Sequence, residues 1–342
     1  MWKALLINFA VLLLLLLCFE IVLRATGIGF DSAAFVPDKI LHHAHKKNYT
    51  FINDNPAASE YSDIVISYDS EGRVTNHDVN QRIDTTKAKL KIALLGDSFT
   101  EAVQVSFSES FTGLLQKRFA DTVAFFNYGV GEYSPVFYYL QAINSFKNQR
   151  FNYAIILLYS NDVRDDSVYY AKANKDATGN VVAISGEENS RLAQFARKSY
   201  LLRLIRKYYI RFVYWKDHRN KPEEKTVGGF IEESPVLSPL TKKLIQQTDS
   251  VLALRGTQLV LSAVPSKYKL INHIPHDSTD FANKVKSYAI EMNYHYIDLV
   301  QAFEIKSQTS LLFFHKDIHF NKNGHEVVAQ QFQEYIYKTA YW

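Results

Sequence analysis

A serine, an asparagine, a histidine and an aspartate occur where the chain passes between apolar and polar stretches. Ser98 ends the tripeptide Gly-Asp-Ser at 96–98, which follows one apolar run without a spacer, and Asn161 follows another apolar run. Asp317 and His319 stand shortly before an amphipathic stretch near the carboxyl terminus. Acyl transfer through a covalent intermediate needs a hydroxyl nucleophile, an imidazole that accepts its proton, a group that orients the imidazole, and donors for the oxyanion. These residue types therefore permit serine-dependent ester chemistry if the fold brings them together.

Several of these residues also have structural interpretations. Asp and Ser are among the best helix N-caps, so we expect Asp97, directly before Ser98, to be a turn or cap residue. His315 and His325 lie near enough to His319 in sequence to compete for the role of base. The order of an aspartate followed by a histidine favours His319. The tripeptide 265–267, Pro-Ser-Lys, also follows a predicted strand, and we expect it to form a turn.

Alternating strands and helices would position these groups. Strands are predicted at 90–95, 123–128, 153–159, 258–264 and 294–299, and helices at 109–119, 136–146, 239–254, 281–292 and 323–337. Strands that alternate with helices and are apolar on both faces favour a parallel sheet covered on two sides. Ligands bind beyond the carboxyl ends of the strands in such sheets. Ser98 and Asn161 both fall at that edge.

The amino terminus predicts a membrane anchor. In residues 4–23 only Asn8 and Glu20 are strongly polar. Twenty residues at 1.5 Å each match a hydrocarbon core of about 30 Å. A cleaved signal peptide is the alternative, but the apolar run is long and the residues after it make a poor cleavage site. We predict an uncleaved anchor at 1–27, with the rest of the chain outside the cytoplasm, although the flanking charges are nearly balanced.

Composition and the segment after the predicted anchor exclude few classes of function. The 342 residues carry a formal net charge of +4, which is too small to indicate a nucleic-acid partner, and the single cysteine, Cys18, allows no internal disulfide. Residues 28–88 are polar and irregular, with a His-rich patch at 42–47. A metal site there is conceivable, but no carboxylate or cysteine accompanies the histidines at ligand spacing. We expect a juxtamembrane linker and lead-in, and no metal.

An insertion at about 163–235 is the most basic part of the chain. Ten Lys or Arg and one acid, Asp217, lie between Arg191 and Lys221, a net charge of 10 − 1 = +9. Helical spacing places Arg203, Arg206, Lys207 and Arg211 on one face and Leu201, Leu204, Ile205, Tyr208, Phe212 and Trp215 on the other. Such a helix either lies on an anionic membrane surface or packs on the domain as a cap with a solvated basic face. Both interpretations remain open from the sequence.

The order of these blocks resembles the SGNH hydrolase superfamily, the GDSL lipase and esterase group. The matching blocks are Gly-Asp-Ser at 96–98, the turn 127–134, Asn-Asp at 161–162 and Asp-Ile-His at 317–319. An upstream segment, 68–73, resembles a lead-in seen in membrane-anchored members. The resemblance implies a three-layer α/β/α sandwich with a parallel, flavodoxin-like sheet of about five strands in a domain spanning 89–342.

The resemblance also implies roles for individual residues. Ser98 would be the nucleophile, His319 the general base and Asp317 the group that orients the imidazole. The oxyanion donors would be the Ser98 backbone N–H, a backbone N–H of Gly131 or Glu132, and the Asn161 side-chain amide. Two departures from the family pattern stand out. A position usually held by glycine falls on Glu132, whose carboxylate could repel an oxyanion, and the last block has one residue between Asp and His where many members have two.

The shorter last block is similar to that of members linked to O-acetylation of exopolysaccharides. The sequence therefore predicts a membrane-anchored serine esterase or acyltransferase acting on O-acyl, chiefly O-acetyl, esters of a cell-surface glycan. It would need no cofactor and could work with a membrane O-acyltransferase partner. One alternative is a lysophospholipase or lipid esterase. Another is a non-catalytic, glycan-binding partner of a membrane acyltransferase, but the complete set of Ser98, Asn161 and His319 argues against it.

Overall fold

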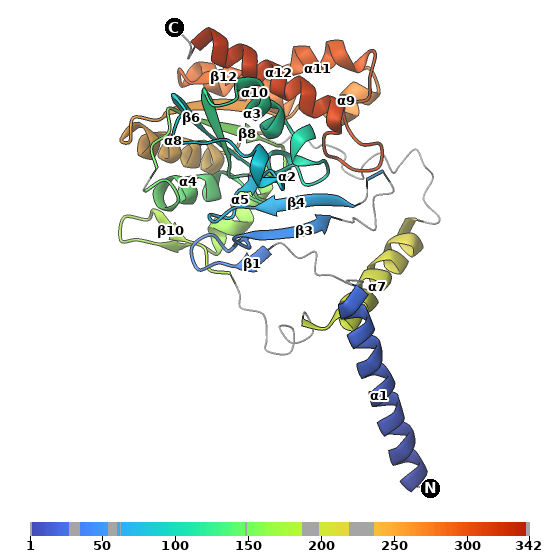
Figure 1. Ribbon diagram of the computed structural model, residues 1–342. Coiled ribbons are helices and arrows are strands. Elements are labelled where there is room, and N and C mark those ends of the chain that lie inside the picture. Colours follow the sequence, from blue (N-terminus) through green and yellow to red (C-terminus); the bar gives the residue numbers. More distant parts are fainter. Residues whose placement is uncertain are drawn as a thin grey trace.

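The computed structural model describes residues 2–26, 35–53, 60–61, 63–147, 149–186, 198–218 and 236–339 (Figure 1). Its centre is an eight-stranded sheet in the order β12-β11-β8-β6-β7-β5-β4-β3. The five parallel strands are β6 (Leu90–Gly96), β7 (Val123–Asn127), β8 (Tyr153–Leu158), β11 (Gln258–Ala263) and β12 (His295–Ile297). Numbered along the chain, these five have the order 2-1-3-4-5, so the prediction of a flavodoxin-like parallel sheet is confirmed.

Helices cover both faces of the sheet. Alternate side chains of each buried strand point to opposite faces, so each strand packs against both helical layers. In β6, Ala93 and Leu95 pack toward one helical layer and Ile92 and Leu94 toward the other. The first layer contains α4 (Pro135–Asn144), α8 (Pro239–Ala253) and α10 (Phe281–Glu291). The second contains α3 (Phe111–Phe119), α11 (Val300–Ser307) and α12 (Lys322–Thr339). The predicted three-layer sandwich is therefore present, and these four side chains of β6 are almost fully buried.

The segment expected to be a linker contributes structure of its own. The three antiparallel strands β3 (Tyr49–Asn53), β4 (Ile64–Tyr68) and β5 (Val74–Thr75) extend the sheet beyond β7. Ahead of them, β1 (Phe35–Pro37) pairs with β2 (His43–His45). No regular apolar alternation marks these strands in the sequence, because only some residues of each short strand are buried, such as Phe51 and Ile66. The described residues 35–53 and 63–75 thus form strands, most of which extend the central sheet, rather than an irregular linker.

Short elements fill the connections. They are the 3₁₀ turns η1 (Val79–Gln81) and η2 (Phe107–Glu109), the helices α2 (Ser98–Glu101), α5 (Asp162–Ala171) and α9 (Lys267–Ile271), and the hairpin β9 (Asn174–Lys175) and β10 (Val181–Ala183). The first part of the expected insertion is therefore α5 and this hairpin, with Tyr169 of α5 in the core of the domain. Residues 187–197 and 219–235 of the insertion lie outside the described residues.

The anchor and the basic helix stand apart from the sheet. An 18-residue stretch of helix α1 (Trp2–Thr26) reaches a mean hydropathy of 2.8 and has no buried residues, whereas Leu23 near the end of the helix is buried. It is the one helix in the described part of the chain that is long and apolar enough to cross a membrane. Helix α7 (Tyr200–His218) lies beside the carboxyl-terminal end of α1 (Figure 1). An amino-terminal apolar helix of this kind fits either a membrane anchor or a signal sequence.

Candidate active site

The turn between β6 and α2 places Ser98 at the first position of a short helix. Asp97 is the N-cap, and its Oδ1 accepts a hydrogen bond from Phe99 N at 2.9 Å, which confirms the expected capping role. Gly96 is required because a Cβ there would lie 2.0 Å from Thr100 Oγ1 and 3.1 Å from Leu157 O. The backbone N–H of Ser98 has no acceptor among the described residues, so it is available to a ligand.

Ser98 faces His319 across the sheet edge. The Ser98 hydroxyl donates to His319 Nε2 at 2.7 Å. The other ring nitrogen, Nδ1, donates to Asp317 Oδ1, which also accepts from the His319 backbone N–H at 2.9 Å. This chain of bonds selects the tautomer in which Nε2 can take the serine proton. The one-residue spacing that departs from the family pattern therefore still brings the carboxylate to the imidazole.

Tyr61 completes the surroundings of Asp317. Its hydroxyl donates to Asp317 Oδ2 at 2.9 Å, so both carboxylate oxygens are hydrogen-bonded. Burial raises the pKa of Asp317, but the bonds from His319 and Tyr61 outweigh that effect and lower it to about 2. Asp317 is consequently ionised wherever His319 works as a base. No sequence signal marked Tyr61, which comes from the lead-in, 256 residues away.

Lys267 holds the loop that carries the base. Its ammonium group donates to the backbone oxygens of His315 and Asp317, each at 3.0 Å. The turn predicted at 265–267 is present, with Ser266 as the N-cap of α9 through its contact with Lys269 N. Besides forming the expected turn, this segment therefore holds the loop 315–319 (the catalytic loop) in place through its lysine.

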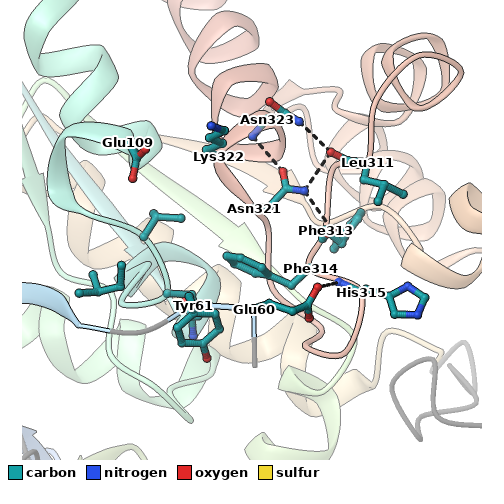
Figure 2. Close-up of a pocket in the computed structure, with 13 residues that line it drawn as sticks. Glu60, Tyr61, Glu109, Leu311, Phe313, Phe314, His315, Asn321, Lys322 and Asn323 are labelled. Carbon is teal, nitrogen blue, oxygen red and sulfur yellow. Dashed lines mark hydrogen bonds between the residues drawn. The ribbon is translucent and has the colours of Figure 1, made fainter. Parts of the chain in front are cut away.

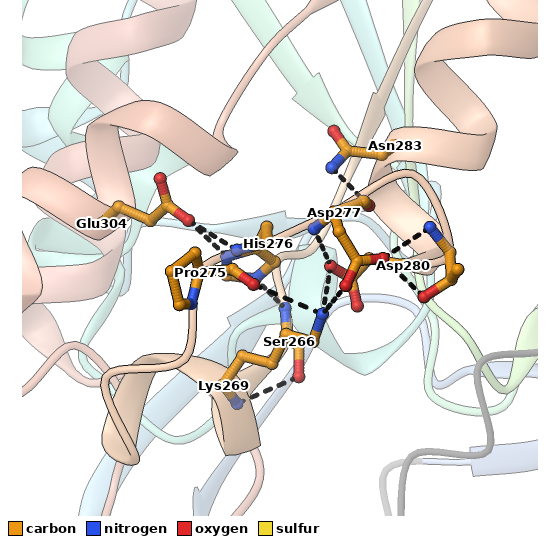
Figure 3. Close-up of polar contacts among 9 residues, drawn as sticks. Ser266, Lys269, Pro275, His276, Asp277, Asp280, Asn283 and Glu304 are labelled. Carbon is orange, nitrogen blue, oxygen red and sulfur yellow. Dashed lines mark hydrogen bonds and ion pairs between the residues drawn. The ribbon is translucent and has the colours of Figure 1, made fainter.

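A cluster of polar contacts around Ser266 and His276 supports the same turn (Figure 3). His276 Nδ1 donates to Glu304 Oε1 at 2.9 Å, while its Nε2 accepts from the backbone N–H of Ser266 at 3.2 Å. The set of Ser, His and Glu resembles a second triad in composition only. The imidazole meets the Ser266 backbone, and the Ser266 hydroxyl caps α9, so this cluster supports the turn.

The opposite side of Ser98 is formed by the turn after β7. Gly131 N–H donates to Glu101 Oε2 at 2.9 Å, and Gly131 O accepts from His43 Nε2 at 2.9 Å. Gly131 is therefore occupied by contacts within the protein. The N–H of Glu132 has no acceptor among the described residues and, in a trans peptide, points away from the Gly131 carbonyl that meets His43. Of the two backbone donors expected here, Glu132 is the available one.

Glu101, at the end of α2, is the buried carboxylate that accepts the hydrogen bond from Gly131 in this turn. Tyr68 donates its hydroxyl to Glu101 at 3.0 Å, and His45 Nε2 donates to it at 2.8 Å. His45 Nδ1 lies 2.8 Å from Gly72 O, so both ring nitrogens of His45 face oxygen acceptors. Burial raises the pKa of Glu101, but the contacts with His45, Tyr68 and the Gly131 N–H together outweigh burial and lower it. The His-rich patch thus supports the site through buried contacts.

Glu132 has an unusual backbone and an engaged side chain. Its φ of +66° lies in the left-handed region, which disfavours residues other than glycine by about 1 kcal/mol or more. Its carboxylate accepts from the Tyr169 hydroxyl at 3.2 Å. The contact directs the negative charge toward α5. The backbone conformation expected of a glycine is thus retained with a different side chain.

Asn161 brings the third donor. Its Nδ2 donates one hydrogen to Asp165 Oδ2 at 2.9 Å, and the amide carries a second hydrogen that can serve a ligand. Arg164 pairs with Asp165 at 3.1 Å, which fixes the acceptor on which the amide is oriented. Ser98, Glu132 and Asn161 therefore supply three N–H groups from three different strand ends.

Buried carboxyl groups lie beneath the nucleophile. Asp97 and Asp162 are both almost fully buried, and each has one oxygen without a partner among the described residues. Burial raises the pKa of Asp97 to about 7. Burial and the neighbouring Asp97 raise the pKa of Asp162 well above its ordinary value. Two adjacent carboxyls in a low-dielectric site favour keeping a proton between them.

His325 and His315, the other two candidates for the general base, have different surroundings from His319. His325 is buried, stacks on Phe111 and accepts weakly from its backbone N–H at 3.4 Å. Burial lowers the pKa of His325 to about 3, so it is neutral and structural. His315 is exposed, and its backbone N–H donates to Glu60. Of the three, His319 is the one beside Ser98.

A cavity of about 560 Å³ opens beside the catalytic loop (Figure 2). Tyr61, Phe314 and His315 lie on one side of it and Glu109 and Lys322 on the other. Neither Ser98 nor His319 is among the described residues that line it. The cavity touches the site through Tyr61, whose hydroxyl reaches Asp317. In the described part of the chain, no group of three or more His, Cys, Asp and Glu side chains could hold a metal ion.

Comparison with known proteins found only distant structural likenesses. No protein-family model matches the chain, and no curated protein matches it in sequence. A lipolytic G-D-S-L family protein from Veillonella parvula has 14% identity and a TM-score of 0.40, with 71% of this chain and 96% of that chain covered. A catalytic mutant of an acetylxylan esterase from Geobacillus stearothermophilus has 12% identity and a TM-score of 0.43, with 74% and 96% covered. An esterase from Pseudoalteromonas sp. has 13% identity and a TM-score of 0.41, with 73% and 98% covered. At such scores the likeness carries no argument about function, which depends on the geometry of the site.

Proposed function

We propose that the protein is a serine-dependent carboxylic ester hydrolase or O-acyltransferase of the SGNH type. The observation that carries this proposal is the hydrogen-bonded series of Ser98, His319 and Asp317, with a free backbone N–H on Ser98 itself. A structural histidine would not need a carboxylate on one nitrogen and a half-buried serine hydroxyl on the other. A degenerate, purely binding member would have no reason to retain all of these contacts.

The geometry supports a two-step reaction. Ser98 Oγ attacks the ester carbonyl carbon while His319 Nε2 takes the hydroxyl proton, and the resulting imidazolium is stabilised by Asp317. The oxyanion receives N–H groups from Ser98, Glu132 and Asn161, each worth a few kcal/mol in the transition state. The C–O bond to the leaving alcohol then breaks, and the alcohol receives the proton from His319. Water or a second hydroxyl attacks the acyl-serine by the same steps in reverse.

We further propose that the substrate is an O-acetylated glycan at the cell surface. This proposal is supported by the last block, Asp-Ile-His at 317–319, which is similar to that of members linked to polysaccharide O-acetylation. The lead-in at 68–73, similar to that of membrane-anchored members, supports a location at the membrane. Helix α1 would be an uncleaved single-pass anchor, with the catalytic domain outside the cytoplasm. A membrane O-acyltransferase could then supply or receive the acyl group.

The test of the chemistry is Ser98→Ala. Turnover of a short-chain aryl acetate should fall by several orders of magnitude while the melting temperature is unchanged, because only the nucleophile is lost. A fluorophosphonate should label the wild-type chain at Ser98, as mapped by peptide mass spectrometry, and should not label the variant. Retention of more than about a tenth of the wild-type turnover would remove Ser98 from the mechanism.

The test of the substrate class compares two esters. Wild type and Ser98→Ala would be given an acetylated oligosaccharide or a lysophospholipid, and acetate or fatty-acid release would be measured. Addition of an unacetylated oligosaccharide separates transfer from hydrolysis, because transfer yields an acetylated acceptor. Activity on the lysophospholipid alone would replace the glycan proposal with a lipid esterase.

A further inference from the structure

Glu20, the acidic residue within the apolar helix α1, caps the amino terminus of α7. Its Oε1 accepts from Tyr200 N at 2.9 Å, and its Oε2 accepts from Leu201 N at 2.8 Å. The hydroxyl of Ser199 also donates to Oε2, at 3.0 Å. The first N–H groups of a helix have no partner within the helix, and a carboxylate there also meets the positive end of the helix dipole. Glu20 therefore acts as an N-cap supplied by a distant segment of the chain.

Arg24 closes the same contact one turn later. It donates to Lys198 O at 2.7 Å and pairs with Glu20 at 2.8 Å. Its guanidinium also lies over the ring of Tyr200, 5.1 Å from the centroid. Leu23 between them is only 3% exposed, although the rest of α1 carries exposed apolar side chains. The polar residues at the end of the apolar helix are thus the ones that fasten α7 to it.

Helix α7 also has a stripe of exposed apolar side chains along one face. Leu202, Ile205 and Tyr209 are 42%, 54% and 65% exposed, and their spacing of three and four residues places them on one face. Arg206 is exposed at the edge of this stripe. A cap helix would bury such a face against the domain. The alternative that the sequence left open, a helix packed on the domain as a cap, is not supported by these exposures.

The position of the contact suggests what covers the stripe. The 25 residues of α1 span about 37 Å (25 × 1.5 Å), which exceeds the roughly 30 Å hydrocarbon core. Glu20 and Arg24 therefore lie near the bilayer edge if α1 spans the membrane. An ionised residue at that depth is costly without a partner. Here the partner is the end of a helix whose apolar side chains begin at the same level.

We infer that α7 is an interfacial helix whose apolar stripe contacts an anionic lipid surface and which Glu20 fastens to the membrane anchor. This inference rests on the proposed anchor and is independent of the proposed ester chemistry. Leu202, Ile205 and Tyr209 enter the headgroup boundary, while Arg206 meets lipid phosphates. The catalytic domain is thereby tied to the bilayer at two helices instead of one.

The experiment uses the full-length chain with Cys18→Ser, so that single cysteines can carry a spin label. Labels would be placed at Ile205 and Tyr209, with a matched control at Leu254, which is 89% exposed on the domain. The protein would be reconstituted in vesicles of phosphatidylcholine with or without about one third phosphatidylglycerol. Collisions with oxygen, enriched in lipid, and with a water-soluble nickel chelate would be measured by power saturation.

In anionic vesicles, the nickel-chelate collision rate at Ile205 and Tyr209 should fall at least about threefold relative to Leu254, and about 1 M salt should reduce that protection. Glu20→Ala should abolish the protection, Glu20→Gln should retain part of it because its amide oxygen still accepts, and Arg206→Gln should weaken it. Ester turnover should be unchanged in all three variants. Labels that remain water-exposed in anionic vesicles would overturn the inference. So would equal protection in detergent without lipid, which would indicate a protein surface covering the stripe.

Discussion

The two sides of Ser98 are built in different ways. On the base side, His319 and its carboxylate partner Asp317 lie two residues apart in one loop. On the oxyanion side, Glu132 is held through Gly131 by Glu101 and His43, which come from two segments outside the turn itself. The base side therefore depends on local spacing, whereas the oxyanion side depends on contacts between segments up to 88 residues apart. Loss of a group should damage the two sides to different extents and in different ways.

The largest effect should come from the base side. His319→Ala should lower kcat by at least about a thousandfold, close to the loss in Ser98→Ala, because the two groups act as a unit. The double variant should be little worse than either single one. His325→Ala is the matched control: it removes a buried side chain, so it should lower the melting temperature and leave kcat of the folded enzyme within about threefold. An inactive but folded His325→Ala enzyme would contradict this assignment.

The oxyanion side is tested by Glu101→Gln. The amide of Gln would face the Gly131 N–H or His45 with a donor where the carboxylate now accepts, so the turn should shift. We expect kcat to fall about 10- to 100-fold with little change in KM, since the oxyanion contact is made only in the transition state. Tyr68→Phe, which removes one bond but leaves the carboxylate, should cost less than about threefold. Equal kcat values for Glu101→Gln and wild type would show that this carboxylate does not position the turn.

Asp97, the buried residue directly before Ser98, should make the free energy of unfolding depend on pH. Its pKa is raised to about 7 from an ordinary value near 4, so the folded protein binds more protons than the unfolded chain between these values. Stability should therefore decrease as the pH rises from about 4 to about 7, by an amount on the order of a few kcal/mol. Asp97→Asn keeps the oxygen that caps α2 but cannot ionise.

The difference in melting temperature between Asp97→Asn and wild type, measured by calorimetry, should therefore grow in favour of the variant from pH 5 to pH 8. A difference that is constant with pH would mean that Asp97 titrates normally. Asp78→Asn, a change at the partly buried N-cap of the turn η1, serves as the control for loss of a carboxylate charge elsewhere.

The smallest effect should come from Glu132→Gly. Glycine adopts a φ of +66° without strain, and the backbone N–H remains, so kcat should stay within about threefold and stability should change by about 1 kcal/mol or less. Tyr169→Phe removes the same hydrogen bond to the carboxylate without relaxing the backbone. A loss of more than about tenfold in Glu132→Gly alone would show that the carboxylate itself takes part in the reaction.

The parallel sheet and the order of the site blocks could be predicted because they depend on local patterns. Apolar runs such as 92–95 form strands that are buried on both faces, and the carboxyl ends of parallel strands meet at one edge. That geometry alone places Ser98 and Asn161 near one another. The pair Asp317 and His319 was predicted from the resemblance of the last block to that of SGNH hydrolases, and the structure joins the carboxylate to the imidazole within a single loop.

The sequence could not reveal the antiparallel extension or the contacts under the oxyanion turn. Strands β3 to β5 are short and only partly buried, so their pattern is too weak to distinguish from a polar linker. The pairing of Glu101 with His45 joins residues 56 positions apart, and the capping of α7 by Glu20 joins residues 180 positions apart. No periodicity records such partners.

What the sequence determined by itself was therefore the set of candidate reacting groups and the parallel sheet that carries them, since these follow from patterns within single segments. The tertiary structure decided which backbone N–H remains free for the oxyanion, which residues hold the catalytic loop, and where the basic helix is attached. These depend on buried polar groups, each of which must find a partner when it leaves water. Only the folded chain determines whether that partner for Gly131 is Glu101, or for the end of α7 is Glu20.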